Sequence, residues 1–147
     1  MRSRTIIGPS MKLRLTILVT ILCATPVMAG AVQCLHYDGE PVTLTGKVTL
    51  QTFYGPPNYG ENPDTDSRET QALLVLAKPI CVDANPSNYE EEEKNQVKVT
   101  LVPPGGMDLG TYAGKKVTFY GTLFHANTGH HRTPVLLQVN GIKKGHE

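Results

Sequence analysis

The chain has 147 residues, of which 39% are hydrophobic and 18% charged, with a formal net charge of +1 and no Trp. This length favours a single domain, and the composition is that of an ordinary globular protein. The near-neutral charge excludes the strongly basic footprint that is typical of nucleic-acid-binding proteins.

The first 31 residues have the pattern of a secretory signal peptide. Four basic residues precede an apolar run over Leu15–Cys23, and small residues follow over Ala24–Ala31. A positive start, a short apolar stretch and a small-residue exit are typical of such a leader. The apolar run is also too short to span a bilayer comfortably. We expect cleavage after Ala29 or Ala31 and export to the periplasm.

Removal of the leader leaves a single domain over residues 32–147, whichever of Met1 and Met11 initiates translation. It holds ten Lys and Arg against thirteen Asp and Glu, a net charge of −3. A mildly acidic domain is a poor binder of phosphate backbones, so we expect no nucleic-acid partner. No later segment is apolar enough to insert into a membrane. The remaining cysteines, Cys34 and Cys81, are predicted to form a disulfide because the exported compartment is oxidising.

The mature sequence alternates β-like runs with turn-rich connections. Apolar and polar residues alternate with a period of two in most of these runs, as in half-buried strands, and one run is continuously apolar. The predicted strands are Val42–Leu50, Leu73–Ala77 continuing toward Val82, Val97–Leu101, Val117–Leu123 and Val135–Val139. A single short helix is predicted over Met107–Ala113, between the third and fourth strands.

Two of the predicted strands contain a glycine in the same local pattern. Val42–Val48 and Val117–Leu123 both read V-T-x-x-G-x-apolar, which places Gly46 and Gly121 inside strands. A glycine there indicates a bend or bulge, and two such bends favour a small coiled barrel over a flat sheet. The order β-β-β-α-β-β resembles that of the OB-fold, a five-stranded Greek-key barrel. We therefore predict a mainly β, OB-like barrel with one short helix and one disulfide.

Two connections are candidates for a binding surface. The segment over Phe53–Glu69 is too long and turn-rich for a bare hairpin. It carries Phe53, Tyr54 and Tyr59, which are predicted either to contact a ligand or partner or to pack on the rim of the barrel. The acidic run in the second connection, over Asp83–Lys94, is interpreted as a solvated loop.

Three histidines, His125, His130 and His131, lie within seven residues between the fourth and fifth strands. Neutral imidazoles bind Zn²⁺ or Cu²⁺, and a hairpin brings His125 opposite the other two. The alternative is that these rings cap strand ends or contact a partner. Adjacent residues on a strand point to opposite faces, so both neighbours ligate one metal only in an irregular loop.

Signatures of catalysis are sparse. Neither Ser67 nor Ser87 lies in a G-x-S-x-G motif. An acid from Asp64, Asp66 or Glu69 beside a histidine would make a hydrolase, but carboxylates in such loops are usually solvated. We expect a protein that is not an enzyme.

The sequence also resembles a bacterial exported family known as domain of unknown function 4431. The segments that carry the resemblance are Gly121–Ala126, Thr128–His131 and Thr133–Leu137, together with Cys34–Tyr37, Val42–Gly46, Phe53–Tyr59 and Pro79–Val82. Arg132 stands where many members carry a third histidine, which argues against an obligatory metal cluster. The resemblance supports export and a disulfide, and it implies no activity.

Three functional hypotheses follow. The first is an exported, non-enzymatic binding module that engages an envelope protein or a secreted enzyme through the Phe53–Glu69 and His125–His131 loops, as an inhibitor or immunity protein does. The second is a periplasmic Zn- or Cu-binding protein that uses the three histidines. The third, a hydrolase that pairs a histidine with Asp64 or Asp66, has the least support.

Overall fold

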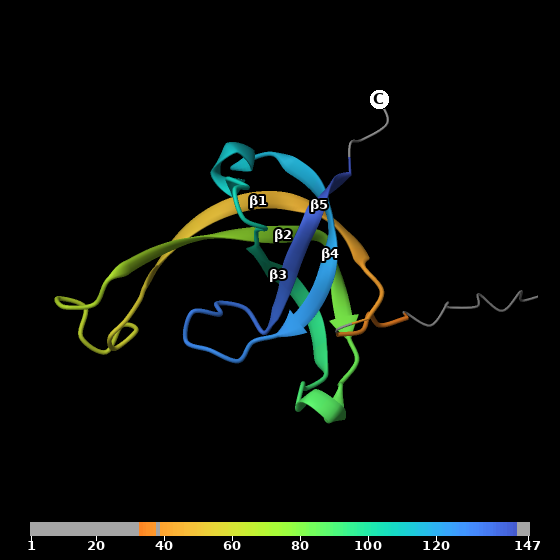
Figure 1. The fold of residues 1–147 in the computed structure, drawn as a ribbon, viewed down its shortest axis with the longest axis horizontal. Helices are drawn as coiled ribbons and strands as arrows, with labels where there is room; N and C mark the ends of the chain where they lie inside the picture. The colour runs from red at the N-terminus through yellow and green to blue at the C-terminus, as the bar shows by residue number, and fades with distance from the viewer. Residues whose placement is uncertain (1–32, 38, 144–147) are drawn as a thin grey trace, which may run out of the picture. The chain divides into compact units, whose positions relative to one another are not determined.

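The computed structural model describes residues 33–37 and 39–143, which fall within one compact unit spanning Val32–Glu147. The predicted signal peptide lies outside the described residues. Within them the chain forms five strands and two short 3-10 helices (Figure 1). In chain order these are β1 Val42–Tyr54, β2 Arg68–Val82, η1 Pro86–Asn88, β3 Glu93–Val102, η2 Leu109–Tyr112, β4 Lys116–His125 and β5 Val135–Lys143. No helix in this part of the chain is both long and apolar enough to cross a membrane.

The strands close into a barrel in the order β1-β2-β3-β5-β4. All neighbouring pairs are antiparallel except β3 and β5, which run parallel over three residue pairs. The interior is filled by alternate apolar residues, the largest of which is the fully buried Phe119. This order is that of a five-stranded Greek-key barrel. The prediction of a mainly β, OB-like barrel is confirmed.

The helix predicted over Met107–Ala113 is a single 3-10 helix over Leu109–Tyr112, at the predicted place between the third and fourth strands. Asp108 caps it by accepting a hydrogen bond from the amide of Gly110 at 2.8 Å. Gly110 within the segment and Gly114 after it disfavour a longer helix. Leu109 is nevertheless buried in the core, so the segment covers one end of the barrel.

The first two strands are longer than predicted. β1 continues to Tyr54 and β2 begins at Arg68, and the two pair in register from Gly46–Leu76 out to Tyr54–Arg68. Their outer halves form an arm that projects from the barrel, seen at the left of Figure 1. The predicted loop over Phe53–Glu69 is therefore shorter, because its first and last residues belong to this ladder.

Both strand glycines allow a backbone approach that no other residue permits. A Cβ at Gly46 would lie 2.3 Å from the carbonyl oxygen of Val75, and one at Gly121 would lie 2.0 Å from that of Gln138. The β4–β5 register also shifts between Tyr120 and Gly121. The bulge predicted at Gly121 is thus present, and at Gly46 the glycine permits close packing of β1 on β2 in a continuous register.

The disulfide between Cys34 and Cys81 is present, as predicted. It joins the segment before β1 to the end of β2. Leu35 continues this attachment, since its amide donates to the carbonyl of Cys81 and its carbonyl accepts from the amide of Asp83, both at 2.8 Å. Tyr37 is then buried against the core.

We expect Gly121→Ala to lower the free energy of unfolding by roughly 1–3 kcal/mol, the usual cost of overpacking. Its new methyl group would overlap backbone atoms of β5. Gly105→Ala is the matched control, because a Cβ there meets no atom within 4 Å. Urea unfolding measures both variants. Equal stability of the two would contradict the assigned close approach.

Reduction of the disulfide, or the double change Cys34→Ser and Cys81→Ser, is expected to cost about 4 kcal/mol of stability. This value is the chain-entropy estimate for the 47-residue separation of the cysteines. Urea unfolding with and without reductant measures it. An unchanged midpoint would show that the bond contributes nothing to the folded state.

Candidate functional site

The turn at the tip of the arm is organised around the carboxylate of Asp66. This side chain accepts hydrogen bonds from the amides of Gly60 at 2.7 Å, Asn58 at 2.9 Å and Asn62 at 3.3 Å, and from the side-chain amide of Asn58 at 3.2 Å. Its desolvation raises its pKa, but these hydrogen bonds outweigh that effect and leave the pKa below its usual range. Asp66 therefore holds the turn together.

A polar network joins the arm to the loop between β4 and β5. Nδ1 of His130 lies 2.8 and 3.0 Å from the two carboxylate oxygens of Glu69 on β2. Arg132 donates to the same carboxylate at 3.1 Å and to the backbone carbonyl of Tyr54 at 2.6 Å. Gln71 adds a hydrogen bond from its side-chain amide to the carbonyl of His130 at 2.7 Å. We call Glu69, Gln71, His130 and Arg132 the clamp, because they fix two segments that are distant in sequence.

The clamp sets the ionisation of its carboxylate and the tautomer of its histidine. The hydrogen bond from His130, followed by that from Arg132, lowers the pKa of Glu69 despite its partial desolvation. A carboxylate only accepts, so Nδ1 of His130 carries the proton. In the neutral ring, Nε2 then accepts from the Tyr59 hydroxyl, 3.1 Å away. This chain of hydrogen bonds orients the His130 ring.

The three aromatic residues of the predicted binding loop contact cationic or histidine side chains. The Arg132 guanidinium lies 5.0 Å from the Phe53 ring centre and 5.7 Å from that of Tyr59. Arg68 stacks 3.7 Å from the ring centre of Tyr54. Tyr59 also packs edge-on against His130. Phe53 and Tyr59 thus meet at the clamp, whereas Tyr54 stacks with Arg68.

A groove of about 530 Å³ lies beside the clamp. Its walls come from β1, β2, β3 and β5, from the segment before and within η2, and from the β4–β5 loop. Most of its lining is apolar, and it includes Leu50, an exposed leucine with 46% of its surface accessible. The lining residues are Leu50, Thr70, Gln71, Ala72, Thr100, Leu101, Val102, Pro103, Met107, Asp108, Leu109, Gly110, His130, His131 and Leu136.

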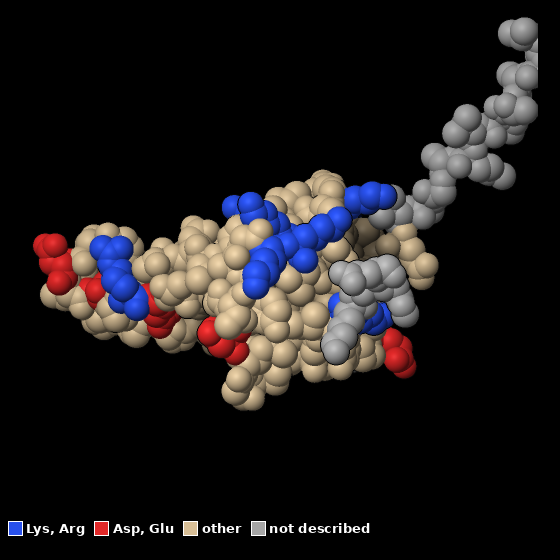
Figure 2. All heavy atoms as spheres, turned by 90° about the horizontal axis from the view of Figure 1, so that it is seen from above, with Lys and Arg blue, Asp and Glu red and all other residues tan. Residues whose placement is uncertain are grey.

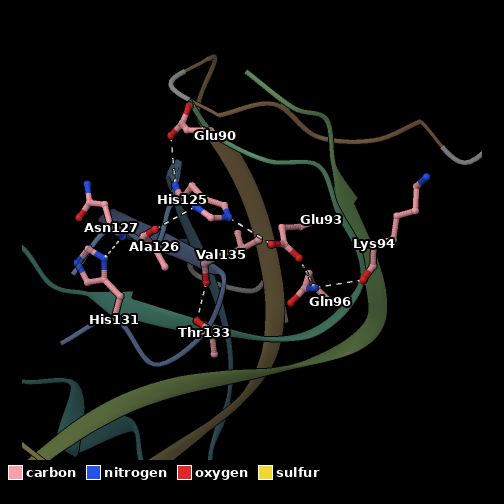
Figure 3. A network of polar contacts seen from close by, with 10 residues as sticks. All are labelled: Glu90, Glu93, Lys94, Gln96, His125, Ala126, Asn127, His131, Thr133 and Val135. Carbon is pink, nitrogen blue, oxygen red and sulfur yellow. Dashed lines mark hydrogen bonds and ion pairs between the residues drawn. The ribbon is translucent and has the colours of Figure 1, made fainter. Parts of the chain in front are cut away.

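His131 lies at the edge of this groove and stabilises the loop. Its Nδ1 accepts a hydrogen bond from the amide of Asn127 at 2.9 Å (Figure 3), and its ring packs edge-on against Phe124. Burial, followed by the electrostatic effect of the adjacent His130, lowers the pKa of His131. The neutral ring is consistent with its role as an acceptor.

His125, at the end of β4, belongs to a different contact. Figure 3 shows its Nε2 directed at the Glu93 carboxylate, 3.2 Å away, and its Nδ1 near the carbonyl of Ala126, 3.0 Å away. Its amide donates to Glu90 at 3.2 Å. Tyr37 packs edge-on against the ring, and burial, then Glu93 and Glu90, raises the pKa of that tyrosine. These contacts join the start of β3 to the end of β4.

The structure does not bring the three predicted metal ligands together. His125 faces Glu93, His130 faces Glu69, and the Nδ1 of His131 is occupied by a backbone amide. Within the described residues, no group of three or more His, Cys, Asp and Glu side chains is arranged to hold a metal ion. A shared Zn or Cu site therefore has no geometric support here.

Of the three acids predicted near the histidines, Glu69 is the one that contacts a histidine in the structure. Asp66 is buried in its own turn, and Asp64 lies exposed in the same turn. The clamp was not predicted, because its contacts join residues 59 to 63 positions apart in the sequence. The run of charged and polar residues at Arg68, Glu69 and Gln71 is visible in the sequence. It does not indicate which residues these side chains contact.

Comparison with protein families gives a match over part of the chain. The model of a domain of unknown function (DUF4431) matches residues 96–143. This range runs from within β3 to the end of β5 and contains the β4–β5 loop, so the predicted resemblance is confirmed over it. No match was found among curated proteins or among solved structures.

The pKa of Asp66 yields a testable pH dependence. Because the folded pKa lies below the ordinary value of 3.8, this group stabilises the fold fully above that value. The contribution is lost as the pH falls through the folded pKa. We expect Asp66→Asn to lower the urea midpoint at neutral pH and to flatten its decline in acid. Asp64→Asn, an exposed neighbour, is the control, and identical acid profiles of the two variants would contradict the assignment.

Proposed function

We propose that this protein is an exported, non-enzymatic binding module that receives a segment of another protein in the groove beside the clamp. The observation that carries the proposal is the groove itself, with a mostly apolar lining beside the clamped β4–β5 loop. An apolar surface that a folded protein leaves exposed is typical of an interaction site. The predicted leader and the disulfide support an exported setting.

The chemistry of the lining favours a protein partner over a polyanion. None of the lining residues is Lys or Arg, and Asp108 adds an acidic group. The clamp arginine is already engaged by Glu69 and by the carbonyl of Tyr54. Leu50 and Met107 present apolar side chains of the kind that accept an anchoring residue of a partner, while His130 and Tyr59 supply polar contacts at the margin.

The clamp supports tight binding because it orders the groove before the partner arrives. The β4–β5 loop is tied to the arm by Glu69 and Gln71, so less conformational entropy is lost on association. Such preorganisation suits an inhibitor or immunity protein. We therefore place the protein in that class, with an envelope enzyme or a secreted toxin enzyme as its target.

Leu50 and Val97 allow a matched test. They are exposed to similar extents, 46% and 49%, and only Leu50 lines the groove. A photo-crosslinking amino acid at position 50 should capture a partner that the same group at position 97 does not. With the purified partner, Leu50→Glu is expected to weaken binding about 30-fold, the effect of a central anchoring contact. Val97→Glu should leave the Kd unchanged.

Equal effects of the two changes, or no captured protein at position 50, would overturn the proposal. Binding is also measured with and without chelator. Loss of the interaction on chelation would instead favour the metal-binding hypothesis.

A further inference from the structure

Lysines from three strands align on the outer face of the barrel. Lys116 on β4 is directly opposite Lys47 on β1, which is opposite Val75 on β2, which in turn is opposite Lys98 on β3. Directly opposed residues of paired strands point to the same side of the sheet. All three lysines are exposed, so the register builds a row of cations across four strands.

A second row lies beside the first. Lys143 on β5 is opposite Thr118 on β4, which is opposite Thr45 on β1. The hydroxyls of Thr45 and Thr118 are 2.8 Å apart. Each threonine lies two residues from a lysine of the first row and so shares its side of the sheet. We call Lys47, Lys98, Lys116 and Lys143 the lysine face.

The proximity of these lysines lowers the stability of the fold, and the ion pairs of the described residues do not offset this cost. Like charges directly opposite in a sheet repel, as Lys47 and Lys116 must. None of the four lysines forms an ion pair with a carboxylate in the part of the chain that the structure describes. Figure 2 shows Lys and Arg side chains gathered in a band across the body of the barrel, with Asp and Glu outside it. The predicted mature chain has a net charge of −3, so this concentration of basic side chains does not follow from the overall composition.

The lysine face also contains a hollow of about 440 Å³. It is lined by Gly46, Lys47, Val75, Ala77, Gly114 and Lys116. The small residues leave room between the two lysines, and none of the six lining residues is acidic. The hollow shares no residue with the groove beside the clamp.

We propose that the lysine face docks on an anionic phospholipid surface, with a phosphate headgroup between Lys47 and Lys116. The cations extend over two rows, which fits a surface of many headgroups better than a single linear polymer. Tyr120, exposed on the same side of β4 two residues beyond Thr118, adds an amphipathic ring suited to the headgroup layer. Docking there leaves the groove, with its different lining, available to a protein partner.

Co-sedimentation of the purified protein with vesicles tests this docking. We expect binding to phosphatidylcholine vesicles that contain phosphatidylglycerol and no binding to phosphatidylcholine alone. Lys47→Gln and Lys116→Gln should each weaken the partition coefficient about fivefold. Raising the ionic strength from about 0.01 M to about 1 M, which shortens the Debye length from about 30 Å to about 3 Å, should abolish binding.

Lys94→Gln is the matched control. It removes the same charge, but Lys94 is paired with Glu92 at 2.8 Å in a different part of the protein. Urea unfolding checks the fold, and Lys47→Gln should be at least as stable as the unmodified protein because it relieves a like-charge pair. Equal weakening by Lys94→Gln, or binding without preference for phosphatidylglycerol, would overturn the proposal. Binding of soluble polyphosphate without binding of vesicles would also overturn it and assign the face to a polymer.

Discussion

The close approach of β2 to β1 at Gly46 is the constraint on which the rest of the structure depends. At this residue β1 pairs with Leu76 of β2 on one side and with Val117 of β4 on the other. A side chain would collide with the carbonyl of Val75, so only glycine lets the three strands meet. Before Gly46 the strand closes the barrel through β4. Soon after it, β1 continues with β2 into the arm that forms one side of the groove.

The clamp fixes the position of the arm relative to the β4–β5 loop. The arm alone would be a two-stranded ladder, which is marginally stable in water. Glu69 ties it to the β4–β5 loop through His130 and Arg132, and Asp66 orders its tip. The groove therefore lies between elements held on both sides. The Arg132–Glu69 ion pair is partly shielded from solvent, which makes it stronger than a fully exposed pair.

The barrel could be predicted from local sequence patterns, because both the alternation of apolar and polar residues and the glycines at 46 and 121 are visible within short segments. The disulfide followed from the number of cysteines and the expected compartment. The arm was underestimated because Thr52, Thr70 and their neighbours are polar on both sides and lack alternation. The clamp depends on contacts between Glu69 and residues of another loop, which no local pattern encodes. For the same reason, the proximity of three histidines in sequence did not indicate their separate contacts.

The hydrogen bonds of Asp66 determine how far a substitution in the turn affects the rest of the protein. Its hydrogen bonds run to Asn58, Gly60 and Asn62, all within the turn, and none reaches the core of the barrel. Tyr59 connects the turn to His130, whereas the residues between Gly60 and Asp66 form their hydrogen bonds within the turn. Replacement of the residues between Gly60 and Asp66 would alter what the tip presents while the barrel folds as before. The surface of the tip can therefore change without the loss of a contact to the barrel.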